Sequence, residues 1–83
     1  QVIIVDNGQL LLNASIPLIS EKLSFKTVDE VPANMNILYE EDSLKGKSID
    51  IENTRKEDTK INLEHLFNAI TENPSLAKSI FNN

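Results

Sequence analysis

The side chains best suited to acid–base chemistry in this sequence are a single histidine, His65, and a run of three acids at residues 40–42. A histidine acts as a general base or a metal ligand when a suitable polar group lies beside it. His65 has no cysteine or second histidine to accompany it, and no serine lies between glycines in a nucleophile turn. On a helical wheel His65 falls opposite an apolar stripe, so we expect it to be exposed. The sequence therefore predicts no catalytic residue, no metal site and no cofactor, and it does not favour an enzyme.

Acidic residues outnumber basic residues by 13 to 8, which gives the chain a net charge of −5. Such a surface repels nucleic acid and anionic membranes, so we expect neither as a partner. The acids at residues 40–42 are adjacent in sequence, which makes them a poor cage for a divalent cation, and we expect a solvated acidic loop there. With two acids upstream they form one candidate interaction surface: Asp29, Glu30, Glu40, Glu41 and Asp42.

The length of 83 residues indicates one small domain spanning residues 1–83. A domain of this size buries only about 60–65% of the surface of its unfolded chain, and such domains often depend on a cross-link, a metal ion or a partner for stability. There is no cysteine to form a disulfide. The sequence starts at Gln1 and enters an apolar stretch at once, so we expect a processed product or a domain of a longer polypeptide or assembly. No apolar run approaches the roughly 18–20 residues of a membrane span.

The strongest local signal is Asn7-Gly8, which stands between two aliphatic runs. Both residues accept the positive φ of a two-residue type I′ hairpin turn. If the strands pair without interruption, Asp6 lies opposite Gln9. One face of the hairpin then carries Ile3, Val5, Leu10 and Leu12, and the other carries Val2, Ile4 and Leu11. A sheet covered on one side alternates apolar and polar residues, so we expect both faces of this hairpin to be covered.

Alternating apolar residues predict three further strands, at about residues 22–28, 35–39 and 48–52. Gly46 suits the left-handed position of the turn between the last two strands. Residues 15–24 are ambiguous between helix and strand, because helical spacing there begins after Ser15, a suitable N-cap, and contains Pro17 in the first turn. We favour a break near Pro17 followed by the strand. Residues 53–60 are polar throughout and are expected to form a solvated linker.

The C-terminal third predicts two helices. The first has an apolar stripe at i, i+3, i+4 and i+7, with Asn62 as its N-cap and Asn73-Pro74 at its end. Asn73 also suits the N-cap of a second, short helix. The stripe of the first helix consists of Leu63, Leu66, Phe67 and Ile70, and the apolar side of the second of Leu76, Ala77, Ile80 and Phe81. The predicted class is α+β, a small antiparallel β-meander packed by a C-terminal helix pair.

Two functions follow as expectations. The first is a non-catalytic protein-interaction or assembly module, self-associating or binding a protein partner, such as a domain of a viral, phage or cell-surface structural protein. It would act through one face of the hairpin or through the last helix, by way of Val2, Ile4, Leu11, Leu76, Ile80 and Phe81. The alternative is a small acidic regulator that binds a basic surface of another protein through the five acids named above. Charge-led binding weakens steeply with salt, whereas apolar burial does not.

Overall fold

The computed structural model describes residues 1–82 and has the predicted α+β class. Within these residues five strands and three helices follow one another, and all three strand pairings are antiparallel. They are β1 (Val2–Asp6), β2 (Gln9–Ala14), α1 (Ile16–Lys22), β3 (Leu23–Val28), β4 (Ile37–Ser43), β5 (Gly46–Glu52), α2 (Leu63–Glu72) and α3 (Pro74–Phe81).

The N-terminal hairpin β1–β2 has the predicted turn but not the predicted register. Asn7 and Gly8 take φ values of 51° and 75°, and Asp6 pairs with Gln9. Beyond the pair Val5–Leu10, however, Ile4 pairs with Leu12, so Leu11 is an extra residue in a β-bulge. Because side chains alternate with a period of two, the bulge exchanges the faces of the second half of β2 relative to an uninterrupted ladder.

The second sheet has the strand order β3–β5–β4, so the prediction of a single meander is wrong. β5 lies in the centre, and the hairpin β1–β2 forms a separate two-stranded sheet. The ambiguous segment resolves into a short helix, α1, followed directly by β3. The oxygen of Ser15 accepts a hydrogen bond from the backbone N–H of Leu18 at 3.2 Å, and Pro17 lies in the first turn, as the helical alternative required. The break that we favoured near Pro17 is therefore wrong.

Helix α2 begins where the sequence predicts. The side-chain oxygen of Asn62 accepts a hydrogen bond from the backbone N–H of His65 at 3.0 Å, which satisfies one of the free donors of the first turn. Asn73 separates α2 from α3 but does not cap α3 with its side chain, contrary to expectation. Its Nδ2 instead donates to the carbonyl of Leu38 at 2.7 Å, which ties the junction of the two helices to β4.

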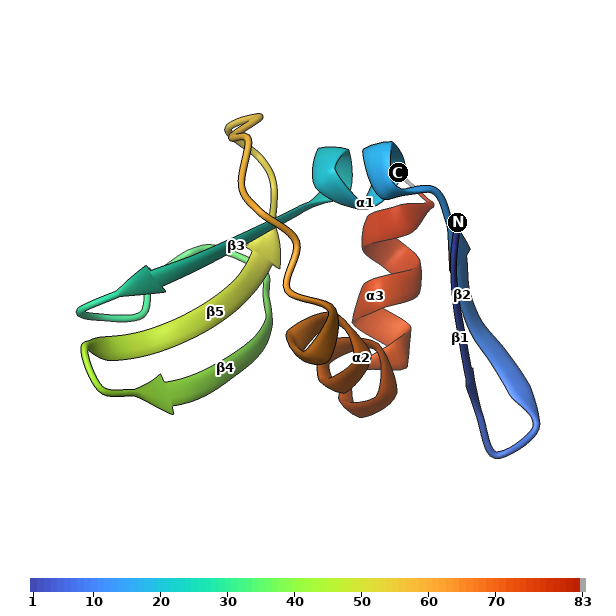
Figure 1. The fold of residues 1–83 in the computed structure, drawn as a ribbon. Coiled ribbons are helices and arrows are strands. Elements are labelled where there is room, and N and C mark those ends of the chain that lie inside the picture. Colours follow the sequence, from blue (N-terminus) through green and yellow to red (C-terminus); the bar gives the residue numbers. More distant parts are fainter. Residues whose placement is uncertain (83) are drawn as a thin grey trace.

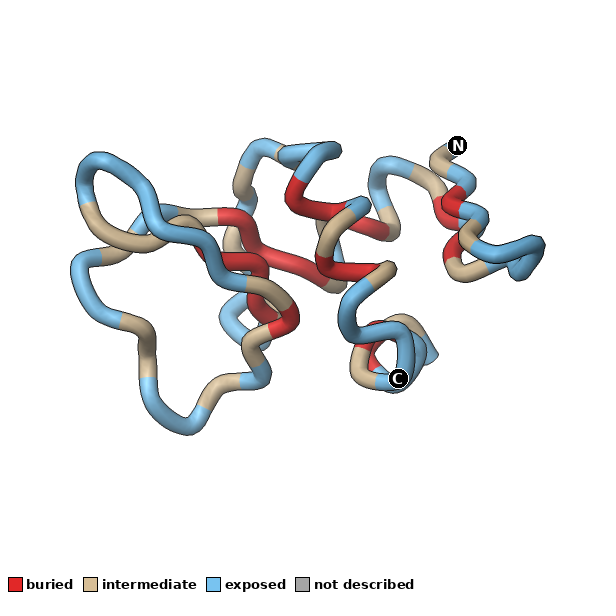
Figure 2. Tube along the Cα trace, turned by 90° about the horizontal axis from the view of Figure 1, so that it is seen from below, coloured by how far each residue is buried: buried red, intermediate tan, exposed pale blue. Residues whose placement is uncertain are grey.

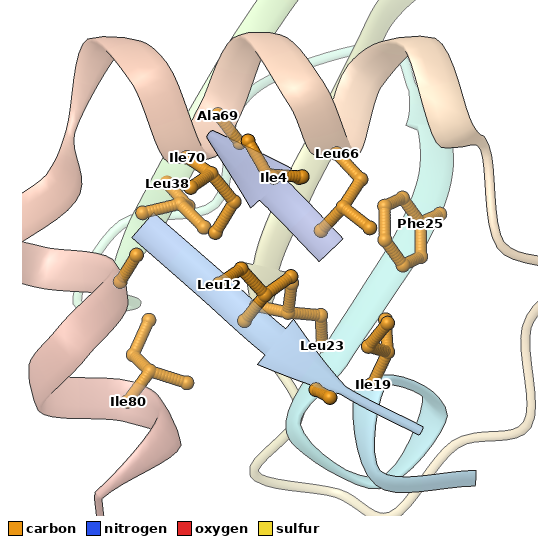
Figure 3. Packing of buried hydrophobic residues seen from close by; sticks show 12 residues of the cluster. Ile4, Leu12, Ile19, Leu23, Phe25, Leu38, Leu66, Ala69, Ile70 and Ile80 are labelled. Atoms are coloured by element: carbon orange, nitrogen blue, oxygen red, sulfur yellow. The ribbon is translucent and has the colours of Figure 1, made fainter. Parts of the chain in front are cut away.

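The helices α2 and α3 lie between the three-stranded sheet and the hairpin (Figure 1). The buried stretches gather where these three parts meet, whereas the tip of the hairpin and the far end of the sheet are exposed (Figure 2). One apolar cluster joins all the elements except β5, with Ile4 and Leu12 of the hairpin facing Leu66 and Ile70 of α2 (Figure 3). The helix pair therefore holds both sheets in place.

Candidate functional site

The outer face of the hairpin carries three large aliphatic side chains that remain exposed. Ile3, Val5 and Leu10 are 61%, 55% and 60% exposed. Val5 and Leu10 are directly paired, and Ile3 is two residues from Val5 on the same strand, so the three side chains share one side of the sheet. They form a small apolar surface, called here the outer hairpin face.

The structure places the interface residues predicted for the hairpin on the other face. Ile4 is buried in the core, while Val2 and Leu11 are half-buried and packed against it. The side of the hairpin that carries Ile4 is the one that α2 covers, and the bulge at Leu11 brings Leu12 onto that side in place of Leu11. The exposed aliphatic face is thus formed by residues that the uninterrupted register assigned to the core.

The residues predicted on the last helix are also less accessible than expected. Ile80 is fully buried, and Leu76 and Phe81 are half-buried against the core. Phe81 nevertheless lines a groove of about 500 Å³ between α3 and β2, together with Leu18 of α1. All six residues of β2, of both side-chain orientations, border this groove and none of β1 does, so it follows the edge of β2 that points away from β1. Leu10 belongs both to the groove and to the outer hairpin face.

Two of the five acids of the alternative surface, Glu41 and Asp42, are engaged within the chain. Asp29 and Glu30 lie in the connection after β3. The acids at residues 40–42 lie within β4, so the prediction of an acidic loop is wrong. The Nζ of Lys47 lies 2.7 Å from Oδ1 of Asp42, and this contact lowers the pKa of that carboxyl. Glu41 contacts the side chain of His65. The acids thus give less of a free, continuous charged surface than the sequence suggested.

His65 is buried, with 9% of its surface exposed, so the prediction of an exposed histidine is wrong. The buried residues of α2 are His65, Leu66, Ala69 and Ile70, whereas Leu63 and Phe67 of the predicted stripe are largely exposed. The helix is therefore rotated toward the side that carries His65 and the small Ala69. This rotation places the imidazole over the three-stranded sheet.

The imidazole of His65 lies between two carboxylates, and we call Glu41, Asp50 and His65 the acid–histidine cluster. Its Nε2 is 3.0 Å from Oε2 of Glu41, and its Nδ1 is 3.6 Å from Oδ1 of Asp50. Tyr39 meets the imidazole edge to face at a centroid distance of 5.5 Å. Burial raises the pKa of Asp50 to about 7, and the positive charge of His65 partly opposes this shift. The sequence pattern had placed Asp50 on the polar side of its strand.

The chemistry available to this cluster is proton binding. Both imidazole nitrogens face carboxylates, and the nucleophile of a hydrolytic triad would need the place that Glu41 occupies at Nε2. A small pocket of about 130 Å³ beside His65 is lined by Ser48, Thr27 and Lys60, among others. Within residues 1–82 no group of three or more histidine or acidic side chains is arranged to hold a metal ion.

Comparisons with known proteins give no relative. No family model, no curated protein and no solved structure matches the chain. The helices of the described region are all too short and too polar to cross a membrane.

Proposed function

We propose that this chain is a non-catalytic protein-interaction and assembly module that associates with a second copy of itself through the outer hairpin face. The observation that carries the proposal is the exposure of Ile3, Val5 and Leu10 side by side. Each is more than half exposed, although removal of such side chains from water is favourable by about 25 cal/mol per Å². A contiguous apolar surface of this kind is typical of an interaction site.

The choice of the hairpin, rather than another face, for the contact with a second copy rests on charge. The chain has a net charge of −5, so two copies repel each other over most of their surfaces. The strand β2, with the sequence QLLLNA, carries no charged residue, whereas β4 carries three adjacent acids. In a twofold arrangement each surface meets its own copy, so paired β4 strands would bring like charges together and paired outer hairpin faces would not.

The size of the outer hairpin face determines how stable a dimer we expect. A stable dimer buries about 800 Å² on each partner, and three aliphatic side chains on a five-residue and a six-residue strand supply less than that. The apolar groove continues the surface around the edge of β2, because Leu10 borders both. We therefore expect a reversible dimer whose population rises with protein concentration.

The test is the molar mass in solution, measured by light scattering at two protein concentrations and two salt concentrations. Leu10→Glu places a charge in the outer hairpin face, and Leu44→Glu places one on a fully exposed leucine between β4 and β5. We expect wild type and Leu44→Glu to dimerise at the higher concentration in both salts, and Leu10→Glu to stay monomeric with an unchanged circular dichroism spectrum. A wild type that is monomeric throughout, or a Leu10→Glu variant that dimerises like wild type, contradicts the proposal. Association that weakens steeply with salt would be led by paired charges rather than by apolar burial, and it too contradicts the proposal.

A further inference from the structure

The side chain of Asp50 is entirely buried, with 0% of the residue exposed, and neither of its carboxyl oxygens has a hydrogen-bond partner among residues 1–82. A buried carboxylate without donors is costly, so such groups bind a proton or lie beside a cation. The basic group that reaches Asp50 is the imidazole of His65, at 3.6 Å. The geometry thus leaves the compensation of this buried acid to an imidazole, which is a cation only when both of its nitrogens carry a proton.

The charged and titratable groups around the cluster come from three elements and the linker. β4 contributes Tyr39 and Glu41, and Glu41 accepts at the second imidazole nitrogen. β3 contributes Lys26, which lines the small pocket beside His65 but is engaged by Glu57 at 2.7 Å. The linker contributes Lys60, which lines the same pocket. α2 itself contributes Glu64, next to His65 in sequence and exposed.

We propose that Asp50, His65 and Glu41 form a proton-operated latch between helix α2 and the three-stranded sheet. When Asp50 and His65 share a proton, its positive charge balances one of the two carboxylates of the cluster, and α2 is docked on the sheet. Loss of this proton leaves two carboxylates against a neutral ring, one of them without access to water, and loosens α2. Helix α2 also packs on Ile4 and Leu12 of the hairpin (Figure 3). A change in pH that loosens α2 therefore also changes how firmly the hairpin, with its outer face, is held.

The direction of the pH effect follows from Asp50. Its pKa is raised from an ordinary value of 3.8 to about 7, chiefly by burial. Between these two values the folded chain keeps a proton that the unfolded chain has released, so the folding equilibrium weakens as the pH rises. The contribution of Asp50 to stability is complete below about pH 3.8 and is lost above about pH 7. Within that window the folding constant falls by up to about tenfold per pH unit.

The test compares Asp50→Asn with a matched control, Asp42→Asn, in the full chain. Asp42 lies on the same β-hairpin, but its side chain is 86% exposed and pairs with Lys47. Urea unfolding followed by circular dichroism at half-unit steps from pH 5 to pH 8.5 gives the folding constant of each protein. We expect wild type and Asp42→Asn to lose stability as the pH rises toward 7. We expect Asp50→Asn to lack most of this slope and to be more stable than wild type at pH 8.

A second measurement keeps the proposal testable if Asp50→Asn does not fold. The carboxyl ¹³C signal of Asp50 in wild type reports its own titration, and hydrogen exchange reports the docking of α2. We expect the signal to titrate near pH 7, and the amides of α2 to lose at least tenfold more protection than those of β3 between pH 5.5 and pH 8, after correction for intrinsic exchange. A carboxyl that titrates below pH 5, an α2 whose protection follows that of β3, or an Asp50→Asn variant with the wild-type slope overturns the latch.

Discussion

Gly46 provides a sharp test of the packing between the start of β5 and the end of β3, which lie side by side in the three-stranded sheet. It has a φ of +134°, and a Cβ added there would stand 2.3 Å from the carbonyl oxygen of Val28 and 3.3 Å from the Cα of Asp29. Both neighbours are backbone atoms of the chain at the end of β3, so no side chain can rotate away to make room. Gly46→Ala must therefore either shift β5 away from β3 or change the turn between β4 and β5.

The magnitude follows from two costs. Backbone strain for a non-glycine residue in such a region costs about 1–3 kcal/mol. Displacement of packed atoms to admit an extra methyl group costs a further 1–3 kcal/mol or so. An 83-residue domain has a free energy of unfolding of only about 4–12 kcal/mol. We expect Gly46→Ala to lower it by about 2–6 kcal/mol, enough to unfold the less stable end of that range.

Gly8 is the matched control. Its φ is +75°, and a Cβ added there meets nothing within 4 Å, so Gly8→Ala bears the backbone cost alone, about 1–2 kcal/mol. Urea unfolding of wild type and both variants, followed by circular dichroism, measures the two losses. If Gly46→Ala loses no more than Gly8→Ala, the close approach of Gly46 to Val28 is not a constraint on the fold and the reasoning fails.

Three further predictions use the same unfolding assay. The side chain of Asn53 makes four hydrogen bonds that join the linker to β3 and α1, so Asn53→Ala should cost about 2–4 kcal/mol, and a loss below 1 kcal/mol would show the network to be unimportant. Asn62→Ala removes the N-cap of α2 and should cost about 1 kcal/mol, with an unchanged m-value. Deletion of one leucine from residues 10–12 removes the bulge but leaves a leucine opposite Ile4, so it should lower the free energy of unfolding by only about 1–2 kcal/mol. As a control, deletion of Ile49 from the central strand shifts the whole register of β5 and should abolish cooperative unfolding.

The elements that the sequence predicted well are those with local signals. The turn at Asn7-Gly8, the N-cap at Asn62 and the break at Asn73 each depend on the conformational preferences of one to three residues. These preferences act whatever the rest of the chain does. The α+β class and the existence of every element except α1 could therefore be predicted, whereas the second half of β4 was mistaken for a loop.

The faces of the hairpin could not be predicted in the same way, because they depend on a single inserted residue. The run of three leucines at residues 10–12 is compatible with both registers, since either one places a leucine on each face. What selects the bulged register is the fit of Ile4 and Leu12 against α2, a contact between segments about 60 residues apart. The strand order β3–β5–β4 likewise depends on β5 pairing with β3 as well as with β4, and no local sequence pattern indicates that pairing.

The burial of Asp50 and His65 escaped the sequence pattern because each looks like a surface residue on its own element, and only the two together make a buried pair. This has an energetic consequence that can be measured. Removing His65 leaves the buried carboxyl of Asp50 without its basic neighbour, so His65→Leu should cost about 3–5 kcal/mol at pH 7. Replacing both by apolar residues removes the desolvation cost along with the attraction, so adding Asp50→Val to His65→Leu should recover at least half of that loss. If the two substitutions are simply additive in a double-mutant cycle, the two side chains do not act as a pair, and the reasoning on their mutual compensation fails.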